Sequence, residues 1–195
     1  MASFQAIAAT GQAIIRLLAD SRPQPEFSTT RFELYQLSDF GDPMEEGISF
    51  FLYRVAVNGT RRNIPPTVGP DGIRHRPPLP VDLHYVASVW AKSPVKQQRL
   101  LGWMVRQLED VPILPTGLLN QSGPEPDVFK PNETVELILE QLTMQDWNNL
   151  WGATKLTAPP LSVGYVARMV GIESTVALSG ELVQTREIGY GKLIS

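Results

Sequence analysis

The stretch VDLHYVASVWA, residues 81–91, decides the fold expected for this chain. Its alternate positions are the apolar residues Val81, Leu83, Tyr85, Ala87 and Val89. Asp82, His84 and Ser88 lie between them. A period of two is typical of a β-strand that turns one face to the core. Residues 81–91 are therefore predicted to form a central strand.

Other segments supply partners for this strand. Predicted strands cover residues 31–37, 48–57, 133–139 and 161–172, because these runs alternate or are rich in β-branched and aromatic side chains. Apolar residues at helical spacing predict helices over residues 4–18, 94–110 and 143–151. The order of elements predicts an α+β fold with a mixed, mostly antiparallel sheet and flanking helices.

Turn signals divide these elements. Asn58-Gly59 favours a tight hairpin turn, so residues 60–64 are expected to return antiparallel to the strand before them. Residues 65–80 are rich in proline and are predicted to form a rigid, extended arm. Residues 112–131, with five prolines and two glycines, are predicted to be a loop.

The composition bounds the function. The chain has 195 residues, is 43% hydrophobic and only 19% charged, which suits one domain with a real core. We expect a domain over residues 1–172 and a tail or arm over 173–195. The net charge of −3 gives no general attraction to nucleic acid. No apolar run is long enough to predict a membrane span.

Signals for catalysis are weak. The absence of cysteine excludes disulfides and thiolate metal sites, and two histidines cannot form a three-histidine zinc site. No phosphate-binding glycine motif opens a helix. Asp82 and His84 share one strand face and could polarise a water molecule, but no third partner is evident. Neither an enzyme nor a bound cofactor is expected, and these two residues are otherwise interface candidates.

The proline-rich arm is also locally basic. Arg61, Arg62, Arg74, His75 and Arg76 lie in or beside it in a chain that is acidic overall. One interpretation is a solvated loop, and the other is a contact arm that meets an acidic partner surface.

Several stretches, in order along the chain, resemble one protein family. They are PPLPVDLHY (77–85), SVWA (88–91), QQRLLGWM (97–104), ELILE (136–140), DWNNLW (146–151) and SVGYVAR (162–168). In this combination they are similar to the cap, or tail-terminator, subunits of phage-tail-like contractile injection systems.

The resemblance implies a fold similar to phage tail-terminator proteins and a structural role without an active site. It implies a homohexameric ring on the distal end of the inner tube and sheath, which ends polymerisation and anchors the last sheath ring. Partners would be the inner-tube and sheath proteins, with assembly in the cytoplasm. An adaptor that links the particle end to a membrane or another host structure is the alternative. The candidate interface residues are Arg61, Arg62, Arg74, His75, Arg76, Pro78, Asp82, His84 and Arg168.

Overall fold

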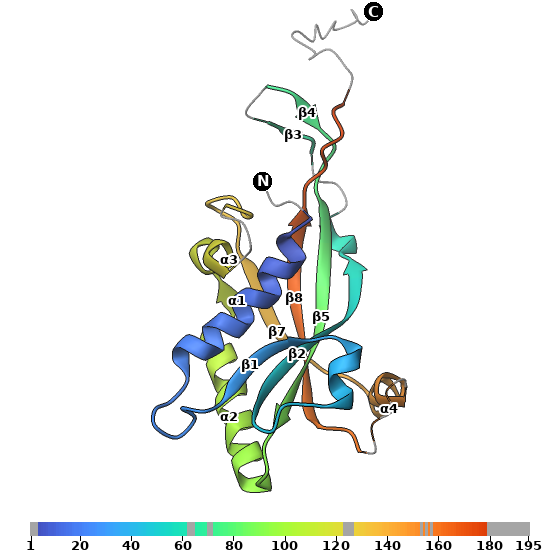
Figure 1. Ribbon diagram of the computed structural model, residues 1–195. Coiled ribbons are helices and arrows are strands. Elements are labelled where there is room, and N and C mark those ends of the chain that lie inside the picture. Colours follow the sequence, from blue (N-terminus) through green and yellow to red (C-terminus); the bar gives the residue numbers. More distant parts are fainter. Residues whose placement is uncertain are drawn as a thin grey trace, which may run out of the picture.

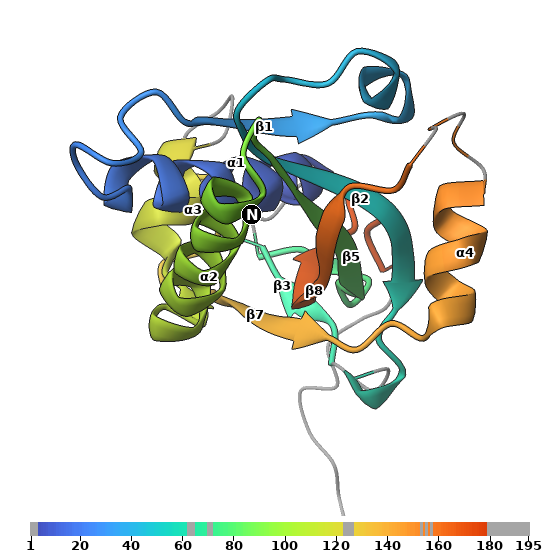
Figure 2. The same cartoon turned by 90° about the horizontal axis from the view of Figure 1, so that it is seen from below.

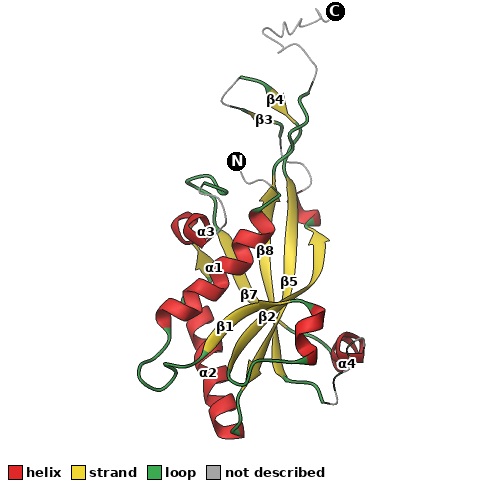
Figure 3. Cartoon of the chain, in the orientation of Figure 1, coloured by secondary structure: helices red, strands yellow, loops and turns green. Residues whose placement is uncertain are grey.

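A six-stranded sheet forms the centre of the molecule (Figures 1 and 3). The computed structural model describes residues 4–61, 65–69, 72–122, 127–152, 154, 156 and 158–178. The strands of the sheet are β1 (Arg31–Tyr35), β2 (Gly47–Val57), β5 (Leu79–Trp90), β6 (Ile113–Leu114), β7 (Val135–Glu140) and β8 (Leu161–Ile172). Their spatial order is β1-β2-β5-β8-β7-β6. Strands β1 and β2 are parallel and the other pairs are antiparallel, which confirms the predicted α+β class.

The first face of the sheet carries the main core. Helices α1 (Ala6–Ser21), α2 (Pro94–Asp110) and α3 (Thr116–Ser122) lie on this side (Figure 2). The alternate apolar residues of β5, from Val81 to Val89, are all buried there, as their spacing predicts. At Gly11 a Cβ atom would lie 3.2 Å from Leu34 and 3.4 Å from the Tyr85 hydroxyl. The glycine therefore lets α1 lie close against the sheet.

The second face is covered only in part. The short 3₁₀ helix η1 (Leu37–Gly41) and helix α4 (Met144–Gly152) pack on the half of the sheet that lies away from the arm (Figures 1 and 2). Phe40 of η1 and Trp151 of α4 meet edge to face, with ring centroids 5.3 Å apart. Thr143 and Asp146 form a capping box at the start of α4, since each accepts the other's backbone N–H.

The predicted hairpin at Asn58-Gly59 is wrong. Strand β2 pairs with β5 instead, and residues Gly59–Arg61 form the 3₁₀ turn η2. The N–H of Asn58 donates to the carbonyl of Pro80 at 2.9 Å, and its side-chain amide donates to Asp82 at 3.0 Å. Residues of β5 therefore accept hydrogen bonds from both the backbone and the side chain of Asn58. The chain leaves the sheet after this residue and forms no return strand in residues 59–61. Residues 62–64 lie outside the described residues.

The interpretation of residues 112–131 as a loop is also wrong for residues 113–122, although residues 127–131 are a loop. Residues 113–122 contain strand β6 and helix α3, both of which contribute to the core through Leu114 and Leu119. The carbonyl of Pro115 accepts the first helical N–H bonds of α3, and the Thr116 hydroxyl donates to the carbonyl of Glu133. The prolines therefore border the short elements and do not interrupt them.

Beyond one end of the sheet the chain extends into an arm (Figure 1). Strands β3 (Thr67–Val68) and β4 (Arg74–His75) form a small antiparallel pair in it. The prediction of an extended segment is confirmed for the described residues between 65 and 78.

Candidate interface surfaces

The arm is built from two segments that are distant in sequence. Residue His75 of β4 forms an antiparallel bridge with Ala177. The N–H of Arg76 donates to the carbonyl of Val176 at 3.1 Å, and the N–H of Leu178 donates to the carbonyl of Arg74 at 2.7 Å. Residues 176–178 are therefore a third strand of the arm, next to β4.

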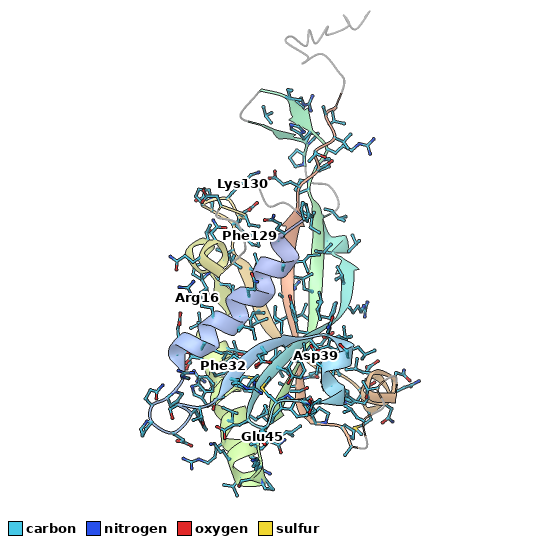
Figure 4. The ribbon with its side chains drawn as sticks, in the orientation of Figure 1. Arg16, Phe32, Asp39, Glu45, Phe129 and Lys130 are labelled. Carbon is cyan, nitrogen blue, oxygen red and sulfur yellow. The ribbon has the colours of Figure 1, made fainter. Side chains whose placement is uncertain are left out.

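An ion pair fixes the C-terminal segment where it leaves the sheet. Glu173, which follows β8 directly and is nearly buried, pairs with Lys130. Figure 4 shows Lys130 at the arm end of the body, with Glu45 at the opposite end. Since Lys130 belongs to the connection between α3 and β7, this contact joins the base of the arm to the domain.

The structure places three of the basic candidates, Arg74, His75 and Arg76, on this arm. Arg74 and His75 form β4, and Arg76 and Pro78 connect β4 to β5. Arg61 ends η2 at the end of β2. Arg62 lies outside the described residues.

Asp82 lies on the second face of β5 and joins three segments. Its carboxylate accepts hydrogen bonds from both Asn58 and the N–H of Met169. Met169 has a φ of 58°, a left-handed conformation that is strained for a side chain of this kind. Because β5 and β8 shift register beside Asp82, the carboxylate satisfies a backbone N–H that the sheet leaves unpaired.

His84, two residues along the same face, contacts a carboxylate from another strand. Its Nδ1 lies 2.9 Å from Oε1 of Glu140 in β7, and the Tyr53 hydroxyl donates to Oε2 of the same carboxylate at 2.9 Å. The side chains of His84 and Glu140 are only 12% and 19% exposed. Burial, followed by the hydrogen bond to Glu140, raises the pKa of Tyr53 well above its ordinary value. The phenol therefore stays a hydrogen-bond donor across the physiological range.

Arg168 of β8 lies on the same second face. Its guanidinium is 3.5 Å from the carboxylate of Glu136, directly across from it in β7. The structure therefore brings Asp82, His84 and Arg168 together on the sheet, while Arg74, His75 and Arg76 lie out on the arm. The candidates that the structure describes do not form one site.

This arrangement offers little for catalysis by Asp82 and His84. The polar atoms of each bind different partners, and no contact joins the two side chains. Among the described residues, no group of three or more His, Cys, Asp or Glu side chains is placed to hold a metal ion. In the same part of the chain, no helix is long and apolar enough to cross a membrane.

Comparison with protein families decides the assignment. The model of the Pvc16 N-terminal domain matches residues 9–186, which is most of the chain. This chain belongs to the Pvc16 N-terminal domain family. A search of curated protein sequences gives no match.

Solved structures support the fold of this family member. One similar structure is described as the sheath/tube terminator of PVC, an extracellular contractile injection system, in the extended state. It has a TM-score of 0.64 at 12% identity over 96% of this chain. Another is the tube-terminating cap of the anti-feeding prophage, with a TM-score of 0.55 at 15% identity over 93% of this chain. The matches cover 64% and 60% of those two proteins, so this chain spans less than two thirds of either.

Sequence reasoning missed three parts of these surfaces in the Pvc16-type domain. They are Tyr53, Glu140 and the strand at 176–178. Alternation places Glu136 and Glu140 on one strand face. It cannot show that β5 and β8 are the two strands between β7 and β2. No local pattern in residues 173–178 indicates a pairing with residues about 100 positions earlier.

Helix α4 borders a third surface. Trp147 and Trp151 stack with ring centroids 6.2 Å apart and planes 11° apart. With Pro159, Pro160 and Leu161 they line a hollow of about 650 Å³. Burial of these rings against η1 and the second face makes them part of the smaller core.

Proposed function

We propose that this chain is the terminator, or cap, subunit of a contractile injection particle, and that it has no catalytic activity. The observation that carries the proposal is the match of 96% of the chain to a sheath/tube terminator, together with membership of the Pvc16 N-terminal domain family. Its partners would be further copies of itself, in a homohexameric ring, and the inner-tube and sheath proteins. The ring would end polymerisation and hold the last ring of sheath after assembly in the cytoplasm.

The physical organisation suits a subunit that works by binding. The polar groups that could do chemistry, Asp82 and His84, are used in internal hydrogen bonds. The arm extends beyond the body, where it has the exposure that a contact between subunits needs (Figure 1). We propose residues 1–172 as the cap domain and 173–195 as a tail, the first part of which completes the arm.

The test is particle length by electron microscopy, in the host strain with and without the gene. Broadly distributed lengths or unstable sheaths in the deletion strain would support a terminator. Normal lengths and a normal cap would overturn the proposal and favour an adaptor between the particle end and a membrane. The mass of the purified protein tests the ring separately, since six copies of 21.6 kDa give about 130 kDa.

A further inference from the structure

The arm has two chemically different faces. His75 and Ala177 are bridge partners, so their side chains lie on one face of the arm. The residues directly before and after these partners in each strand therefore have their side chains on the other face. These are Arg74, Arg76, Val176 and Leu178, joined by Val68, which is opposite Arg74. We name this set the basic–apolar face.

The aliphatic side chains of the basic–apolar face are open to solvent. Val68 is 63% exposed, Val176 is 48% exposed and Leu178 is 36% exposed. A ribbon of this size has no core of its own and is marginally stable in water without a surface to pack on. Three exposed aliphatic residues on one face of so small a unit are typical of a contact surface.

The two arginines of this face have no anionic partner among the residues that the structure describes. Within the described residues, neither guanidinium forms an ion pair, whereas Arg16, Arg99, Arg106 and Arg168 each pair with a carboxylate. Two arginines without an ion pair in the described part of the chain, flanked by valine and leucine, match a surface where carboxylates lie beside apolar side chains.

We propose that the basic–apolar face binds an acidic, partly apolar protein surface at the end of the tube–sheath particle. This inference rests on the proposed function and adds the residues and the charge of one contact. A protein is favoured over a polyanion, because the chain is net −3 and this face has only two arginines. It is favoured over a lipid surface, because the face has no aromatic residue to sit at a membrane interface.

The experiment measures binding of the purified full chain to particles made in a strain that lacks this gene. The test variant is Arg74→Glu with Arg76→Glu. The conservative variant is Arg74→Lys with Arg76→Lys. A matched control is Arg99→Glu with Arg106→Glu, which reverses two exposed arginines of α2, far from the arm. Each variant is first compared with the wild type by circular dichroism and by its mass in solution.

We expect the Glu variant to bind at least about tenfold more weakly, and the Lys variant and the control to bind nearly as well as the wild type. Wild-type binding should also weaken as salt rises, and that dependence should be shallower in the Glu variant. If the wild type binds the particles and the Glu variant binds them equally well, this inference is overturned and the proposed function is left intact. A wild type that does not bind uncapped particles would overturn both.

Two further outcomes would redirect the assignment. Loss of the hexamer mass in the Glu variant would overturn the inference by placing the face between copies of this chain. Binding of the wild type to phosphatidylserine vesicles, abolished in the Glu variant, would overturn it in favour of a lipid surface.

Discussion

The hydroxyl of Tyr53 in β2 donates a 2.9 Å hydrogen bond to Glu140 in β7, although β5 and β8 lie between these strands in the sheet. Neighbouring strands are about 4.8 Å apart, so a flat sheet would separate β2 and β7 by about 14 Å. The contact therefore shows that the second face is concave. His84 of β5 completes the link by binding the other carboxylate oxygen.

Removal of this carboxylate should destabilise the fold. Glu140→Ala leaves the Tyr53 hydroxyl and the His84 ring without their acceptor, so we expect the free energy of unfolding to fall by about 2 kcal/mol. Tyr53→Phe removes only one bond and should cost about 1 kcal/mol. Urea denaturation measures both. The double variant should lose less than the sum of the two, because both act on one contact.

The matched control is Glu136→Ala on the same strand face. Glu136 pairs with Arg168 at 3.5 Å in a solvent-exposed position, so its loss should cost under about 0.5 kcal/mol. Equal losses for Glu140→Ala and Glu136→Ala would show that the link across the concave face adds nothing to stability.

Gly47 should not tolerate a side chain. A Cβ atom there would lie 2.5 Å from the carbonyl oxygen of Arg31 and 2.0 Å from the sulfur of Met44. Gly47→Ala must therefore push β2 away from β1, and we expect a loss of about 2–3 kcal/mol in the free energy of unfolding. Gly102→Ala in α2, where nothing lies within 4 Å, should instead stabilise by about 0.5–1 kcal/mol. Thermal unfolding of both variants gives the comparison, and a neutral Gly47→Ala would contradict the packing described here.

The Glu46 carboxylate should make stability depend on pH. The hydrogen bond from Lys96 lowers the pKa of Glu46 below its ordinary value of 4.5, and bonds from Thr29 and Thr30 add to this. Because the folded pKa is the lower one, the stabilisation is complete above about pH 4.5 and is lost as pH falls through the folded pKa. Glu46→Gln should therefore cost about 0.5–1 kcal/mol at neutral pH.

The difference in the free energy of unfolding between the wild type and Glu46→Gln should begin to shrink below the unfolded pKa of about 4.5 and vanish below the folded pKa. Urea titrations across this range measure it. Glu45→Gln is the control, since Glu45 and Lys92 form a fully exposed ion pair. Loss of this pair should cause no detectable change in the free energy of unfolding. If the difference in the free energy of unfolding between the wild type and Glu46→Gln does not change with pH, the contribution of the Glu46 carboxylate is not electrostatic.

Residues 176–178, the third strand of the arm, should protect the backbone N–H of Arg76 from hydrogen exchange. Removal of residues 173–195 deletes the carbonyl of Val176, which accepts the N–H of Arg76. Hydrogen exchange at Arg76 should then rise by about tenfold or more, while amides of the β5–β8 pairing keep their protection. Removal of residues 179–195 alone keeps this acceptor, and protection of Arg76 should remain. Fast exchange at Arg76 in the full chain would contradict the three-stranded arm.

Local patterns predicted much of this fold, because they depend on neighbours in the chain. The alternation in residues 81–91 and 161–172 placed two long strands and assigned the core face of β5. The helical spacing of apolar residues predicted α2 and placed α4 within one residue of its observed bounds. The prolines of residues 112–131 led to the wrong prediction of a loop over β6 and α3. A proline next to a short element cannot be told in sequence from a proline within a loop.

The sequence by itself determined the strand faces, the long helices, the extended arm and the resemblance to a cap family, because each depends on residue types at fixed local spacing. Only the tertiary structure decided that Asn58 binds β5 and forms no hairpin turn, and that Glu140 joins Tyr53 to His84. It also decided that residues 176–178 complete the arm and define its basic–apolar face. These contacts join residues 24 to about 100 positions apart, and such pairings depend on the packing of the whole sheet rather than on any one segment.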